Sequence, residues 1–339
     1  MAKRSFNKKA RSLEPAVMKL HYALDTPEGA NSSSTHYLSI TRDISRLNRR
    51  FYRQGLNMAV ANVKVTTLPA AAGVAGSQCY VNSIPHTWPV AGAWVKAFHA
   101  WRDQQDAAIE LMGGESAVAR FRDFKISMED GMTVGATANP VNLGPGRFVG
   151  AFAPGLKFTN DLDASEDWNA SQIVIPNDVV PGVTVEYNLH MVGDSVATSK
   201  GIIHGYEQSR AFPQSPDPAS PQVSTSWLNR MHDVGNDSDE IVDNAELNNN
   251  ELPYDQNEYP GGKTNFINLE TQGYNLNQST VGLNTFNTGP FTAPCGLIRI
   301  DIQDVISSVS SGAGSHTIVE VTLVPGSHRG YLAETMEEF

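Results

Sequence analysis

Short runs rich in β-branched and aromatic residues, separated by loops of Gly, Pro, Asn and Asp, recur along most of this sequence. Runs of this kind predict β-strands, and we place them at residues 56–68, 122–129, 147–153, 171–175, 183–191, 200–206, 296–302 and 316–324. A clear helical spacing of apolar side chains spans about residues 90–112, and Gly113 and Gly114 end it. Eight strands with one inserted helix predict an all-β fold, an eight-stranded jelly roll or β-sandwich with long loops.

The domain organisation follows from the length and from the first residues. A chain of 339 residues fits two average domains or one large all-β domain. The sequence contains no internal repeat, so we expect residues 42–339 to form a single jelly-roll domain. Residues 1–41 begin with basic side chains and continue into a turn-rich run from Thr26 to Ser34, which predicts a flexible N-terminal arm.

The charges of the chain are distributed unevenly. Residues 1–53 hold eleven Lys or Arg side chains against four Asp or Glu, whereas residues 54–339 hold 14 against 32. A short basic segment on a large acidic body indicates a protein that contacts a polyanion on one side and water on the other. An ordinary acidic enzyme does not require this distribution.

The cations of the first 53 residues are candidate phosphate ligands, because neutralising phosphates releases condensed counterions. Arg46, Arg49, Arg50 and Arg53 would form one basic stripe on a helix, or lie on both sides of an extended segment. The candidate nucleic-acid-binding residues are Lys3, Arg4, Lys8, Lys9, Arg11, Arg42, Arg46, Arg49, Arg50 and Arg53. Among residues 1–11 the only aromatic is Phe6, so we expect binding without base stacking and without sequence preference. A merely solubilising tail is the alternative.

No catalytic motif is recognisable, and we expect no enzymatic activity, no cofactor and no metal site. The nine histidines are scattered without metal-ligand spacing. Residues 233–258 carry nine carboxylates without one Lys or Arg. These acids could bind calcium, but they do not follow the EF-hand pattern, and we favour a solvated acidic loop.

The sequence contains few features that indicate a cellular compartment. The longest apolar runs are far shorter than the roughly 18 residues of a membrane helix, and no apolar segment follows the basic N-terminus, so we expect neither a membrane span nor a secretory signal. Cys79 and Cys295 are the only cysteines. We expect two buried free thiols in a reducing compartment, with a single disulfide as the alternative.

Several segments, in order along the chain, are similar to one protein family. They are Asn48-Arg-Arg-Phe-Tyr-Arg-Gln-Gly55, Thr87-Trp88, Ala93-Trp-Val-Lys-Ala-Phe-His-Ala-Trp101, Arg122-Asp-Phe-Lys125, Ser209-Arg210, Ser215-Pro-Asp-Pro218, Pro253-Tyr-Asp-Gln-Asn-Glu-Tyr-Pro-Gly-Gly262 and Val324-Pro-Gly-Ser-His-Arg-Gly-Tyr331. The set resembles capsid proteins of circular, Rep-encoding single-stranded DNA (CRESS DNA) viruses of the environmental, largely marine kind, including bacilladnavirus-like ones. It reaches from about residue 42 to residue 331.

The resemblance implies a single jelly-roll coat protein that self-assembles into an icosahedral shell around circular single-stranded DNA. Arg46, Arg49, Arg50 and Arg53 would then lie near the inner surface. The protein would be found in the virion and assembled inside the host cell, with the nucleus as one candidate site. Many such capsids carry a longer, arginine-dense arm, whereas the first eleven residues here hold five cations.

Three rival interpretations remain open at this stage. A capsid protein of a single-stranded RNA virus would use the same cations, since phosphates look alike to lysine. A carbohydrate-binding jelly roll would be a stable monomer with exposed aromatic side chains in a cleft. A hydrolase on a β-sandwich is disfavoured, because no acid/base or nucleophile set is recognisable.

Overall fold

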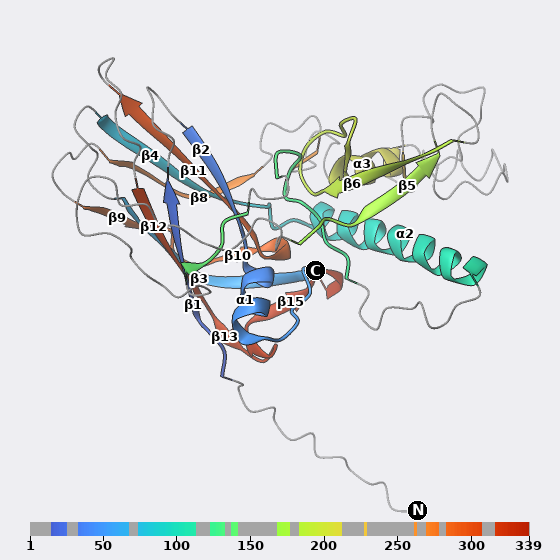
Figure 1. Cartoon of the computed structure of the whole chain (residues 1–339), viewed down its shortest axis with the longest axis horizontal. Helices are drawn as coiled ribbons and strands as arrows, with labels where there is room; N and C mark the ends of the chain where they lie inside the picture. The colour runs from blue at the N-terminus through green and yellow to red at the C-terminus, as the bar shows by residue number, and fades with distance from the viewer. Residues whose placement is uncertain are drawn as a thin grey trace, which may run out of the picture.

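Two curled antiparallel sheets and a helical layer beside them make up the molecule (Figure 1). The computed structural model describes residues 15–25, 33–67, 74–112, 123–132, 137–141, 168–176, 183–211, 227–228, 261–262, 269–277, 283–306 and 316–338. Strands account for most of its regular structure, which agrees with the all-β sandwich expected from the sequence.

The two sheets each collect strands from both ends of the chain. The first sheet contains β1 (Lys19–Asp25), β3 (Leu56–Thr67), β9 (Asn284–Asn287), β10 (Phe291–Ala293), β12 (His316–Leu323) and β15 (Ala333–Thr335). Its order is β1-β12-β3-β10, with β9 and β15 also paired to β3. The second sheet has the order β2-β11-β4-β8, formed by β2 (Ser33–Ser39), β11 (Leu297–Ile306), β4 (Val74–Ser83) and β8 (Glu270–Asn277).

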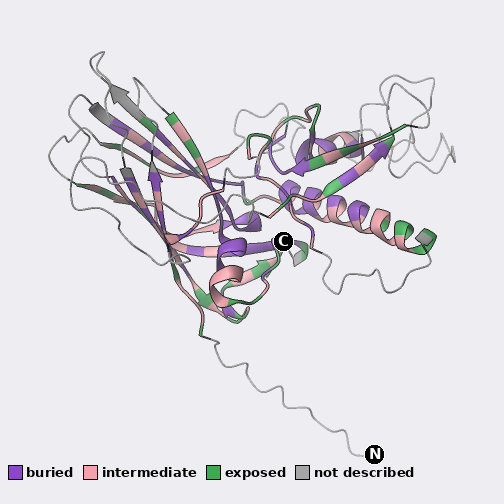
Figure 2. Cartoon of the chain, viewed as in Figure 1, coloured by how far each residue is buried: buried purple, intermediate pink, exposed green. Residues whose placement is uncertain are grey.

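Alternating burial along the strands places the sandwich core between the two sheets (Figure 2). On β12, Val319 and Val321 are fully buried, whereas Glu320 between them is partly exposed. Ile298 and Ile300 of β11 enter the same apolar cluster. Side chains alternate between the faces of a strand, so these β-branched residues form one apolar face and fix the register of each strand.

A long insertion between β4 and β8 forms the second layer. It contains α2 (Trp88–Met112), β5 (Gln172–Pro176), β6 (Thr184–His190), β7 (Ser199–Gly201) and α3 (Ile202–Ala211). The small sheet has the order β5-β6-β7, and α2 packs against both α3 and β5. Trp94, Phe98 and Trp101 of α2 surround Phe124, with ring centroids 5.5–5.8 Å from that ring. This aromatic group belongs to an apolar cluster separate from that of the sandwich.

Short elements complete the chain at the junction of the layers. Helix α1 (Ile40–Asn48) follows β2 directly, and its first half is buried. The remaining elements are η6 (Pro294–Gly296), β13 (Pro325–Gly326), β14 (Gly330–Tyr331) and η7 (Met336–Glu338). The segment from α1 to β3 therefore lies where the sandwich meets the insertion (Figure 1).

Five of the eight expected strands are confirmed. The structure has β3, β5, β6, β11 and β12 where the sequence predicts strands, and α2 where it predicts a helix. The expected strand at 200–206 is wrong, because only residues up to Gly201 are extended and α3 follows. In 122–129 the described residues contain only an isolated bridge at Ser127. The expected strand at 147–153 lies outside the described residues.

The boundary expected between arm and domain is also corrected. Within residues 1–41, β1 pairs with β12 along seven residues, and β2 pairs with β11. Both strands belong to the sandwich, because Leu20, Tyr22 and Leu38 fill its core. The folded sandwich therefore begins by Lys19, not at residue 42.

Two further properties bear on the compartment. Both cysteines, Cys79 and Cys295, are buried free thiols, as expected. Burial raises the pKa of the Cys79 thiol to about 12. Among the helices of the described ranges, none combines the length and apolar character that a membrane span requires.

Candidate nucleic-acid interface

Arg42 occupies the buried side of α1. Its Nε donates a 2.9 Å hydrogen bond to Asp43 Oδ1, and its Nη2 donates to the carbonyl oxygen of Ala138 at 2.6 Å. Tyr22 of β1 donates its hydroxyl to the other oxygen of Asp43 at 2.6 Å. The Arg42 side chain is 1 % exposed. These bonds join α1 to β1 through Asp43 and to residue 138 of the insertion through Arg42. The burial of Arg42 corrects the expectation that it contacts phosphate at the surface.

The same burial perturbs Asp43. Removal from water raises its pKa to about 6, although the charge of Arg42 and the hydrogen bonds from Tyr22 and Arg42 oppose the shift. An ion pair with no access to water is sustained only by such hydrogen bonds. The cluster therefore has a structural role and a sensitivity to pH.

The other arginines of this segment lie toward the surface. Helix α1 ends at Asn48, and Arg49 adopts the left-handed conformation with φ 53°. This change of direction prevents the single helical stripe through residues 46–53 and turns the chain toward β3. Arg49, Arg50 and Arg53 are exposed, whereas Arg46 is half-buried and donates to Asn139 Oδ1 at 3.0 Å.

A C-terminal turn packs against this segment. Arg329 donates its Nη1 to the carbonyl oxygen of Phe51 at 2.7 Å, and Tyr52 returns its hydroxyl to the carbonyl oxygen of Arg329 at 3.0 Å. The rings of Tyr52 and Tyr331 meet edge to face at 5.4 Å. These contacts join residues 48–55 to residues 324–331, and they add an exposed guanidinium beside Arg50 and Arg53.

Lys125 and two aromatic rings border the segment on the side of the insertion. Lys125 Nζ lies 5.3 Å from the ring centroid of Trp168 and 3.1 Å from Asp123 Oδ2. Phe51 lies 6.0 Å from Trp168, with the two rings tilted by 43°. Burial raises the pKa of Asp123, against the opposing charges of Lys125 and Arg53. The cations here are thus interleaved with aromatic side chains, which the sequence did not suggest.

Two cavities meet across this region. One of 780 Å³ has Phe51, Trp94, Phe98 and Phe124 in its lining, and a smaller one of 330 Å³ lies between α1 and Trp168. Both include Arg50 and Phe51, so they adjoin. We call the pair the basic–aromatic groove. Its lining contains six Lys or Arg residues and two acids; the six are Arg46, Arg49, Arg50, Arg53, Lys125 and Arg329.

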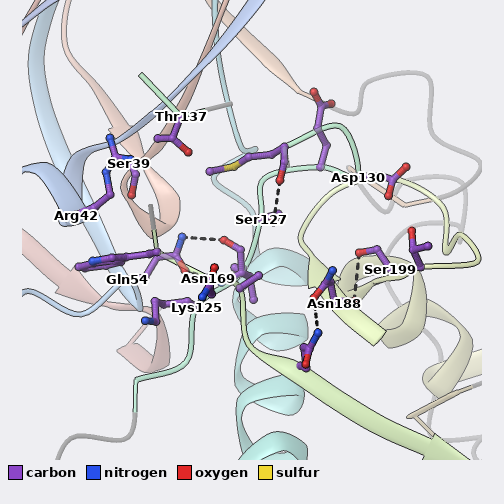
Figure 3. A pocket seen from close by; sticks show the side chains of 17 residues that line it. Ser39, Arg42, Gln54, Lys125, Ser127, Asp130, Thr137, Asn169, Asn188 and Ser199 are labelled. Carbon is purple, nitrogen blue, oxygen red and sulfur yellow. Dashed lines mark hydrogen bonds between the residues drawn. The ribbon is translucent and has the colours of Figure 1, made fainter. Parts of the chain in front are cut away.

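A third cavity of 520 Å³ is lined mainly by amides, hydroxyls and charged side chains and shares Lys125 and Trp168 with the groove (Figure 3). Gln54 forms one wall, where its amide accepts from Ile126 N at 2.6 Å and donates to Ile126 O at 2.8 Å. On the opposite side Asn188 lies 3.3 Å from Gln172. These internal bonds fix the lining and use part of its hydrogen-bonding capacity.

The remaining expectations fall outside the described ranges. Lys3, Arg4, Lys8, Lys9 and Arg11 precede residue 15, and the whole of the acidic run 233–258 is likewise not described. Within the described part of the chain, no group of three His, Cys, Asp or Glu residues is arranged to hold a metal ion.

In the comparisons with known proteins, no family model, no curated protein and no solved structure matches this chain. The fold and the groove are therefore the features that point to a function.

Proposed function

We propose that this chain is a viral coat protein, with a structural role and no catalytic step. Copies of it would assemble into an icosahedral shell that encloses a single-stranded nucleic acid genome, in a virion built inside the host cell. The basic–aromatic groove and the basic N-terminal residues would contact the genome. Single-stranded DNA is proposed because of the resemblance to capsid proteins of circular, Rep-encoding DNA viruses.

The order in which the strands pair is the main observation behind the proposal. The two sheets contain ten strands, and β10 and β15 are short strands that pair with β3. The other eight are, in chain order, β1, β2, β3, β4, β8, β9, β11 and β12. The first pairs with the last, the second with the seventh, the third with the sixth and the fourth with the fifth, all antiparallel. A long hairpin rolled into two sheets has this pairing, which supports a jelly roll of the kind found in viral capsids. Lectins and cupins also use jelly rolls, so the choice of a capsid depends in addition on the charge distribution and on the resemblance.

The charge distribution supports a polyanion as the enclosed partner. The chain has a net charge of −11, yet the groove lining carries six cations against two acids. The five cations of residues 1–11 are joined to the sandwich through β1, which lies in the same sheet as β3. A cationic face on an acidic body favours a shell whose inner side contacts phosphate and whose outer side stays hydrated.

Microscopy and sedimentation of the purified, expressed chain test the proposal directly. We expect closed shells in negative stain and a fast-sedimenting species that protects nucleic acid from nuclease. DNase and RNase digestion of the extracted nucleic acid then separates a DNA from an RNA genome. Sedimentation of only monomers or dimers across a range of salt and pH would contradict a coat function.

A further inference from the structure

The larger cavity of the groove combines features that phosphate binding alone does not need. Its volume of 780 Å³ falls within the range of about 300–1,000 Å³ found for small-ligand pockets. Its lining includes four aromatic side chains together with Arg50, Arg53 and Arg329. Trp94, Phe98 and Phe124 belong to the apolar cluster of the insertion, whereas Phe51 and Trp168 are only partly buried among the cations. Cations alone suffice to hold a nucleic-acid backbone, so the partly exposed rings beside them offer an additional kind of contact.

On the basis of the proposed function, we infer that the basic–aromatic groove binds unpaired nucleotides by base stacking. A base would stack on the partly exposed rings of Phe51 and Trp168, while neighbouring phosphates lie against the guanidinium groups of the groove. Because the bases of a duplex are already stacked and paired, the groove would select single strands over duplexes.

The charges of the rim favour a polyanion. Arg49, Arg50 and Arg53 are exposed, and Arg329 is fixed beside them by its bond to the Phe51 carbonyl oxygen. The carboxylates of the lining are Asp123, which pairs with Lys125, and Glu337. A guanidinium binds a phosphate through two parallel hydrogen bonds and also stacks on ring systems.

The aromatic lining offers surfaces for bases. Phe51 is half-buried and belongs to both cavities, and Trp168 extends the aromatic surface into the smaller one. Every base has a π-face, so stacking on such side chains tolerates any sequence. The inference differs from the expectation of binding without stacking, which considered only the aromatics of residues 1–11.

Trp94 belongs to the buried part of the cavity wall. It is 6 % exposed, and its indole Nε1 is buried with no hydrogen-bond partner among the described residues. Because this nitrogen has almost no accessible surface, it offers no hydrogen bond to an occupant of the cavity. The surfaces available for stacking are therefore those of the partly exposed rings of Phe51 and Trp168.

Two other occupants are less suited. The basic residues 1–11 of this chain or of a second copy would be repelled by the rim cations. The acidic run 233–258 has the right charge, with nine carboxylates and no Lys or Arg, but its carboxylates gain nothing from aromatic walls. The test therefore includes polyglutamate as a competitor.

The experiment measures binding of the full chain to a fluorescent oligo-dT and to a duplex of equal length, by anisotropy over a range of salt. We expect Phe51→Leu and Trp168→Leu each to weaken oligo-dT binding about tenfold with an unchanged salt slope. Arg53→Gln should instead flatten the slope by about 0.7. Tyr274→Leu, at a 72 % exposed aromatic on β8, is the matched control and should change neither.

Equal affinity of the native chain for strand and duplex would overturn the inference. It would also be overturned if neither aromatic variant lost affinity, or if polyglutamate competed as well as oligo-dT. Two aromatic positions are used so that a folding defect in one variant leaves the other decisive. Shell formation is measured separately by sedimentation. If shells form but single strands are not preferred over duplexes, only the stacking inference is refuted. If single strands are preferred but no shells form, the coat function is refuted.

Discussion

The side-chain amide of Asn48 donates a 2.7 Å hydrogen bond to the hydroxyl of Tyr331, 283 residues further along the chain. The same hydroxyl donates to the carbonyl oxygen of Val17 at 2.6 Å, and Asn48 Oδ1 accepts from Val17 N at 3.0 Å. Three distant segments thus meet at the end of α1. This network positions both the arginines after Asn48 and the residues that lead into β1.

Replacing Tyr331 with phenylalanine removes this junction without changing the ring. The Val17 carbonyl loses its donor and the Asn48 amide loses an acceptor, so we expect the free energy of unfolding to fall by about 2 kcal/mol. Urea denaturation of the dissociated chain measures the change. Tyr274→Phe, at an exposed tyrosine, should stay within about 0.5 kcal/mol; an equal loss in both variants would contradict a special role for the junction.

Asp43 should make stability depend on pH. Burial raises its pKa to about 6 in the folded chain, from the 3.8 that is ordinary for an aspartate. The folded state therefore binds the proton more tightly, so the contribution of Asp43 to stability increases as pH falls from above 6 toward 4. We expect the stability advantage of the native chain over Asp43→Asn to be larger at pH 5 than at pH 7.5. Denaturant titrations at both pH values check the sign, and a larger advantage at pH 7.5 would refute it.

Strands with a strong apolar alternation were predictable from the sequence. Alternation in β12 and the isoleucines of β11 mark two of the sandwich strands directly. By contrast, β1 and β2 follow a basic start and flank a turn-rich run. The basic and turn-forming residues around them predicted a flexible arm, although both strands contain apolar residues. Pairing with β12 and β11 stabilises them, and such long-range partners are not visible in a local pattern.

Helix α3 shows tertiary packing overriding propensity. Ile202 and Ile203 favour a strand, yet both are fully buried in a helix that packs against α2. Gly92 permits the contact, because a Cβ there would lie 2.8 Å from the Tyr206 hydroxyl oxygen. Lys96 of α2 also donates to Ser209 Oγ of α3 at 2.7 Å.

The groove was only partly visible in the sequence. The sequence pointed to the arginines at 46, 49, 50 and 53, but it also suggested Arg42 as a phosphate ligand, and burial removes Arg42 from the surface. Trp168, Lys125 and Arg329 come from three distant segments and carry no local signal of their own. Lys125 and Arg329 do lie in two of the segments that resemble capsid proteins, 122–125 and 324–331. Only the fold shows that these segments lie against residues 48–55.

Gly55 should tolerate no side chain while Trp94 is present. A Cβ at Gly55 would lie 2.4 Å from one carbon of the Trp94 six-membered ring and 2.6 Å from another. We expect Gly55→Ala to destabilise the chain by about 1–3 kcal/mol through overpacking. Trp94→Phe removes those ring atoms, so the double variant should be more stable than the sum of the single changes predicts. Strict additivity in a denaturant-based cycle would contradict this contact.

Two N-terminal deletions should separate nucleic-acid binding from folding. Removing residues 1–11 takes away five cations and leaves β1 intact, so we expect an unchanged melting temperature and less packaged nucleic acid. Removing residues 1–25 also deletes Leu20, Tyr22 and Leu24 from the core, where each buried side chain contributes about 1.5–3 kcal/mol. This longer deletion should therefore fail to fold stably. Thermal melts and the absorbance ratio of purified particles at nucleic-acid and protein wavelengths check both outcomes. Unchanged nucleic-acid content after the shorter deletion would assign genome binding to the groove arginines alone.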